Sequence, residues 1–120
     1  MGASSRFNDE RLPAVFSNFG QNSVDVFAPG VDLNSTTPDN TYSIFSGTSM
    51  ASPTVAGVAA LLISLHPELT GAEIRNLVLQ NTRSRADLSV LLPGSEKKVD
   101  FGLLSRTGGI VDVMLALSGL

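Results

Sequence analysis

Residues 40–65 contain no formally charged side chain, and this feature constrains the fold more than any other in the sequence. Long solvent-exposed segments normally carry charges, so we expect this region to be deeply buried. Alternation over residues 42–45 predicts a short strand. Small and hydroxylic residues follow, and an apolar run then extends over residues 55–65. The stretch therefore predicts a strand, a tight turn at residues 47–49 and a buried helix.

A serine in the first turn of such a helix has a chemical use. The backbone N–H groups beside Ser49 lack intrahelical partners and lie at the positive end of the helix dipole. Such donors stabilise the negative charge that develops on a carbonyl oxygen during acyl transfer. Gly47 permits a sharp turn, Ala51 and Ser52 leave space around the hydroxyl, and Pro53 costs little this early in a helix. A serine at a helix start is more commonly an N-cap, so residue type alone leaves both interpretations open.

The string Gly-Thr-Ser-Met-Ala-Ser-Pro at residues 47–53, followed by Val-Ala-Gly at 55–57, resembles the active-serine signature of the subtilisin-like serine proteases. The nucleophile elbow Gly-x-Ser-x-Gly of another hydrolase class is not matched, because Ala51 occupies its last position. The resemblance implies that Ser49 is the nucleophile and that its own N–H serves the oxyanion hole. It also implies that Thr48 lies beside that hole and that Met50 lines the leaving-group side of the cleft.

The resemblance covers residues 2–82 and 108–117. It implies an α/β fold, the C-terminal fragment of a subtilisin-like three-layer arrangement with a parallel sheet and a buried central helix. Residues 1–120 would then be the C-terminal portion of a peptidase domain. Two departures are visible, since Ser46 replaces a frequent asparagine and Thr54 stands where many members have histidine. We expect both to alter packing or cleft contacts.

In this family a histidine takes the proton of the serine and an aspartate orients that histidine. The family order is Asp, His, Ser, so both partners, and the asparagine that donates to the oxyanion, would lie upstream of this sequence. The only histidine here is His66. A helix rising 1.5 Å per residue places it about 24 Å from Ser49, whereas a general base must approach to about 3 Å. We expect His66 to lie at the helix C-terminus instead.

The resemblance therefore implies a serine endopeptidase that hydrolyses peptide bonds through an acyl-enzyme on Ser49. We expect the chain alone to be inactive, because its base is missing. The alternatives are a non-catalytic binding or structural module and one half of a split protease. The implied partners are a protein or peptide substrate and the upstream part of the same protease or a complementing chain. Membership of the family would suggest a secreted or extracytoplasmic protein.

Charge and composition argue against several other classes of function. A net charge of −3 without a basic cluster argues against nucleic-acid binding. The longest apolar run is shorter than the roughly 20 residues of a membrane span, so we expect no membrane association. No cofactor is expected, and calcium sites of the family are not visible. The acidic residues Asp25, Asp32 and Asp39 occur in loop-like surroundings, and we interpret them as solvated rather than as metal ligands.

Local patterns predict the remaining elements. Thr70 with Glu73 forms a capping-box pattern ahead of a helix ending near residues 81–82. Asp112 is placed as the N-cap of a last short helix. Alternation over residues 24–28 predicts a strand that ends at Pro29. Residues 83–107 leave two alternatives open, a short hairpin or a surface excursion, with their charges on a solvated face.

Overall fold

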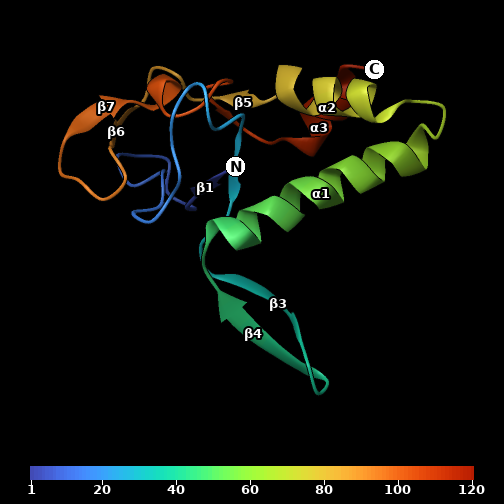
Figure 1. Ribbon diagram of the computed structural model, residues 1–120, viewed down its shortest axis with the longest axis horizontal. Coiled ribbons are helices and arrows are strands. Elements are labelled where there is room, and N and C mark those ends of the chain that lie inside the picture. Colours follow the sequence, from blue (N-terminus) through green and yellow to red (C-terminus); the bar gives the residue numbers. More distant parts are fainter.

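The computed structural model describes residues 1–120, which form a small central sheet, three helices and two hairpins (Figure 1). The four-stranded sheet has the order β1 (Gly2–Ser4), β2 (Phe27–Pro29), β8 (Gly109–Ile110) and β5 (Arg83–Ser84). The pairs β1–β2 and β2–β8 are parallel, and β5 is antiparallel to β8. The predicted α/β class with a parallel sheet is thereby confirmed. The strand expected over residues 24–28 is confined to β2.

Three helices accompany the sheet: α1 (Thr48–Leu65), α2 (Gly71–Gln80) and α3 (Val113–Ser118). The start of α1 packs on the sheet through small side chains, because Ala51 forms one buried cluster with Ala3 and Ala28. Farther along, Leu62 of α1 joins a second cluster with residues of α2 and α3. The helix that carries the candidate site is thus fixed near both of its ends.

The capping predictions are confirmed. Thr70 is the N-cap of α2, where its hydroxyl accepts from the N–H of Glu73 while the Glu73 carboxylate accepts from the N–H of Thr70. Asp112 is the N-cap of α3 and accepts from the N–H groups of Met114 and Leu115 at 3.0 and 3.1 Å. His66 is the C-cap of α1, as predicted.

Residues 83–107 contain a hairpin, so the first of the two alternatives predicted for this region is confirmed. Strands β6 (Ser89–Leu91) and β7 (Lys98–Asp100) pair antiparallel, and the 3-10 helix η1 (Phe101–Leu103) follows them. Val90 and Phe101 are fully buried, and the Phe101 ring lies 4.8 Å from the Phe27 ring between centroids. This region therefore supplies core as well as a charged surface.

The second hairpin, β3 (Leu33–Thr37) with β4 (Thr41–Phe45), extends away from the body of the molecule just ahead of α1 (Figure 1). Asp39 and Asn40 at its tip both adopt left-handed backbone conformations, with φ of 64° and 58°. Asp and Asn are the non-glycine residues that tolerate this region best. The strand predicted over residues 42–45 is confirmed as part of β4.

The expectation of deep burial over residues 40–65 is wrong for this chain. Within α1 only Ala51 and Leu62 are buried. The large apolar side chains of β4 and α1 that remain exposed are Tyr42, Ile44, Phe45, Leu61, Ile63 and Leu65. The physical reason is that no other element of these 120 residues covers these side chains, although the composition of α1 is that of a core helix.

The apolar run in the sequence is too short for a membrane span, but the helix that contains it, α1, is longer than that run. Its 18 residues have a mean hydropathy of 1.5, which is long and apolar enough for a membrane span by length and composition alone. The core helix of a non-membrane protein has the same properties, so this observation by itself favours neither interpretation.

Candidate functional site at the start of the uncharged helix

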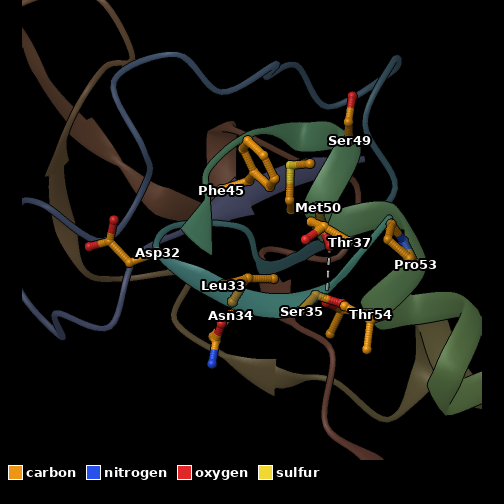
Figure 2. Close-up of a pocket in the computed structure, with 11 residues that line it drawn as sticks. Asp32, Leu33, Asn34, Ser35, Thr37, Phe45, Ser49, Met50, Pro53 and Thr54 are labelled. Atoms are coloured by element: carbon orange, nitrogen blue, oxygen red, sulfur yellow. Dashed lines mark hydrogen bonds between the residues drawn. The ribbon is translucent and has the colours of Figure 1, made fainter. Parts of the chain in front are cut away.

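Ser49 occupies the second position of α1 and is solvent-exposed. The N-cap is Gly47, and no side chain makes a capping hydrogen bond there. Ser49 therefore does not serve as an N-cap, which was the alternative for this residue. Its hydroxyl points outward from the first turn, on the side away from Met50 (Figure 2).

The backbone around Ser49 supplies free donors. The N–H groups of Met50 and Ala51 both donate to the carbonyl of Gly47, at 3.0 and 3.2 Å. Those of Thr48 and Ser49 precede the first hydrogen bond of the helix and have no intrahelical acceptor. They lie at the positive end of the α1 dipole, where developing negative charge is stabilised. The Ser49 hydroxyl and its own N–H thus belong to one exposed turn.

A cavity of about 610 Å³ lies between the hairpin and the first two turns of α1 (Figure 2). Its lining residues are Asp32, Leu33, Asn34, Ser35, Thr36, Thr37, Phe45, Ser49, Met50, Pro53 and Thr54. The structure thereby brings two of the sequence-predicted site residues, Ser49 and Met50, to one cavity. Thr48 lies next to them in the first turn but is not part of the lining.

Sequence reasoning missed the contribution of the hairpin to this cavity. Leu33 and Phe45 pair directly across β3 and β4, and both line the cavity. The signal that could have found them is the alternation on each side of the turn at Asp39–Asn40. In an antiparallel hairpin, that alternation fixes which residues share a face.

The turn itself is held by the segment Pro29–Asp32, which connects β2 to β3. The N–H of Gly47 donates to the carbonyl of Gly30 at 2.7 Å. A Cβ on Gly30 would lie 2.8 Å from the Gly47 oxygen, so only glycine allows this approach. Gly47 has a φ of 161°, which is extended backbone open to any residue. The glycine that the turn requires for steric reasons is therefore Gly30 rather than Gly47.

No general base accompanies Ser49 in this chain. His66 lies at the other end of α1, where its Nδ1 is 3.1 Å from Oε1 of Glu68. A backbone hydrogen bond and the contact with His66 lower the pKa of Glu68 below its usual value. Asp32 is the only titratable residue that lines the cavity, and its carboxylate points away from Ser49 (Figure 2).

The acidic residues weighed as metal ligands are not grouped together. Asp25 Oδ1 lies 3.3 Å from Arg75 and 3.7 Å from Arg106, so two guanidinium groups stand where a cation would bind. Asp32 and Asp39 lie at opposite ends of β3. No group of three or more His, Cys, Asp or Glu residues in the chain is arranged to hold a metal ion.

The amino-acid sequence is similar to those of known proteins. The model of the subtilase family matches residues 2–108. Subtilisin NAT of Bacillus subtilis subsp. natto is 49% identical over 69 residues, which cover 58% of this chain and 18% of that protein. Alkaline elastase YaB of Bacillus sp. (strain YaB) is 46% identical over 82 residues, which cover 68% of this chain and 20% of that protein.

Solved structures give the same result. The prenylagaramide maturation protease PagA superposes with a TM-score of 0.74 at 27% identity, covering 99% of this chain and 41% of the other. A cold-adapted subtilisin-like serine proteinase gives a TM-score of 0.63 at 31% identity, covering 92% and 33%. The chain thus spans about a fifth of the length of the first two relatives and less than half of either structure. With the family match extending from β1 to the residue before β8, the chain belongs to the subtilase family.

Proposed function

We propose that this chain is the part of a subtilisin-like serine endopeptidase that carries the nucleophile, and that the nucleophile is Ser49. The observation that supports this most directly is the exposed serine hydroxyl beside free backbone donors at the rim of a cavity. A structural serine at a helix start would donate or accept a capping bond, and Ser49 has no such role.

The proposed reaction follows the serine protease template. Ser49 Oγ attacks the carbonyl carbon of the scissile peptide while a histidine removes its proton. The negative charge on the former carbonyl oxygen is stabilised by the N–H of Ser49, with Thr48 beside it. The histidine then protonates the leaving amine, the C–N bond breaks and an acyl-enzyme remains. Water activated by the same histidine hydrolyses this ester and regenerates Ser49.

The cavity provides the leaving-group side of the cleft in this proposal. Met50, Phe45 and Leu33 form its apolar wall, and the hydroxyl and amide side chains of β3 form the polar one. An extended peptide beyond the scissile bond would lie between the hairpin and the first turn of α1. The substrate class is accordingly a protein or peptide.

The histidine and aspartate must come from outside these 120 residues, because His66 is at the far end of α1. In subtilisin, loss of the catalytic histidine costs about 10⁶ in turnover. The chain alone would therefore be catalytically silent. We propose that the region bearing Asp and His, upstream in the same protease or on a complementing chain, also covers the uncharged face of α1. By analogy with the family, the whole enzyme would act outside the cytoplasm.

Labelling with a fluorophosphonate tests this proposal. The 120-residue chain alone should react slowly, and the same chain joined to its Asp- and His-bearing region should be labelled stoichiometrically at Ser49. Ser49→Ala should abolish labelling, whereas Ser52→Ala, which removes another exposed serine of α1, should leave it unchanged.

Rapid labelling of the isolated chain would show that it needs no external base. Absence of labelling in the joined protein would show that Ser49 is not a nucleophile, and would leave a non-catalytic binding module as the function.

A further inference from the structure

We propose that the segment Pro29–Asp32 is a clamp that positions Ser49, and that Ser46 and Thr54 are positioning residues that act through it. This inference rests on the proposed role of Ser49 as nucleophile. The clamp contacts the serine turn on both sides, at residues that precede and follow Ser49 in the sequence. These are also the two positions where the sequence departs from the frequent residues of the family.

The upstream contact joins Asp32 to Ser46. The N–H of Asp32 donates to Ser46 Oγ at 2.8 Å, and Ser46 Oγ donates back to Asp32 Oδ1 over a longer 3.5 Å. Asp32 adopts a φ of 55°, which is a left-handed conformation. Aspartate tolerates this conformation better than most residues because its short side chain can form local hydrogen bonds. Because Ser46 directly follows β4, this pair fixes the base of the hairpin against the start of α1.

The central contact lies between backbones. The N–H of Gly47 donates to the Gly30 carbonyl, and Gly30 is buried against the turn. A Cβ at Gly30 would meet the Gly47 oxygen and the Ala3 Cβ at 2.8 Å, and the Ala51 Cβ at 3.2 Å. The clamp and the turn are therefore as close as two backbones pack, so a shift in one displaces the other.

The downstream contact is weaker. Thr54 Oγ1 lies 3.1 Å from the Met50 carbonyl and 3.4 Å from the Pro29 carbonyl. A hydroxyl carries one proton and cannot donate fully to both acceptors. The shorter distance assigns most of this bond to Met50, within the helix. Thr54 consequently contributes less to the clamp than Ser46, and the two variants should rank in that order.

The position of the first turn matters because it carries Ser49, and few side chains of α1 are fully buried. Only Ala51 and Leu62 of the helix are buried. Reactive groups that are displaced by about 1 Å lose on the order of 10²-fold in rate. The clamp thus sets where the Ser49 hydroxyl and N–H lie relative to the cavity in this chain.

Two readouts test the clamp. The first is amide hydrogen exchange at Gly47 in the 120-residue chain. Ser46→Ala should accelerate it about threefold to tenfold, as expected for loss of one hydrogen bond, without changing exchange at Ile74 and Val78 of α2. Ser46→Thr keeps the hydroxyl and should restore protection. Ser43→Ala serves as the matched control, since Ser43 is on the same hairpin but does not contact the clamp.

The second readout is acylation of the chain joined to its Asp- and His-bearing region. Ser46→Ala should lower kcat with KM nearly unchanged, Thr54→Val should do so less, and Ser46→Thr should recover the rate. A merely structural role would change stability but not this split. Unchanged Gly47 exchange in Ser46→Ala, or an unchanged kcat, would overturn the clamp while the wild-type protein still reacts. Failure of the wild type itself to be acylated would overturn the proposed nucleophile and, with it, the positioning role.

Discussion

The β6–β7 hairpin and the β3–β4 hairpin differ in what their apolar side chains contact. The first buries Val90 and leads into Phe101, which packs against Phe27 of the central sheet. The second leaves Tyr42 and Ile44 exposed at 71% and 64%, and it continues into a helix with no charge. The apolar side chains of the β6–β7 region are buried by other parts of the chain. Large apolar side chains of the β3–β4 hairpin and of α1 are left exposed, because no part of the chain covers them.

This difference shows where the stability of the chain resides. Burial of large apolar side chains stabilises a fold roughly in proportion to the area removed from water. The sheet side therefore contributes most of the free energy of unfolding, whereas α1 is held at Ala51, Leu62 and the clamp. The candidate site lies on the lightly held side, which makes its geometry sensitive to whatever covers α1.

The largest expected effect contrasts Phe101 with Ile63. Phe101 is fully buried, so Phe101→Ala should lower the free energy of unfolding by about 3–5 kcal/mol. Ile63 is 47% exposed on α1, so Ile63→Ala should change it by no more than about 0.5 kcal/mol. Urea unfolding of both variants measures this. Equal losses would mean that the outer face of α1 is covered in the isolated chain.

A smaller effect is expected at Asp112, which caps α3 and pairs with Arg83. Asp112→Ala should cost about 1–2 kcal/mol, and Asp112→Asn, which still caps, should cost less. The N–H of Leu115, assisted by Arg83, holds the pKa of Asp112 below its ordinary value of 3.8. Because the folded-state pKa is the lower one, this stability is present above pH 3.8 and is lost as the pH falls through the lowered value.

Thermal unfolding followed at several pH values checks the Asp112 prediction. The wild type and Asp112→Asn should converge as the pH falls below 3.8. A constant difference between them down to the lowest pH would contradict the assigned cause.

A still smaller loss is expected for Thr70→Ala, which removes the capping box of α2. It should lower the free energy of unfolding by about 0.5–1 kcal/mol. The N–H and hydroxyl of Thr70 lower the pKa of Glu73, so this interaction also weakens in acid as Glu73 becomes protonated. Helix content by circular dichroism, compared between Thr70→Ala and Thr70→Ser, measures the effect. Equal helix content in the two variants would show that the hydroxyl does not hold the first turn.

The smallest change in stability is expected for charges on α1. Leu61→Lys with Leu65→Lys places two charges on side chains that are 43% and 53% exposed. The free energy of unfolding should stay within about 0.5 kcal/mol. Self-association measured by sedimentation should decrease, because an exposed apolar face promotes contact between copies. A large loss of stability with unchanged association would show that Leu61 and Leu65 are buried in the isolated chain, and would contradict the difference drawn between the two regions.

Several helix ends could be predicted from the sequence because their determinants are local. The Thr70–Glu73 box and the Asp112 cap each depend on groups within three residues. Hydrogen bonds of that reach are encoded by adjacent residue types. The resemblance around Ser49 likewise indicated the subtilase family, whose model matches residues 2–108.

What only the tertiary structure decided depends on segments distant in sequence. The sequence left two alternatives for residues 83–107, and the pairing of β6 with β7, with Phe101 packed against Phe27, makes this region a hairpin. The absence of charge over residues 40–65 indicated burial, yet burial requires a partner surface, and these 120 residues supply one for only part of α1, at Ala51 and Leu62. The contact of Ser46 with Asp32 joins residues 14 positions apart and is set by how β2 approaches the helix. A sequence specifies what each side chain is suited to contact, and the three-dimensional path of the chain decides which of those contacts are made.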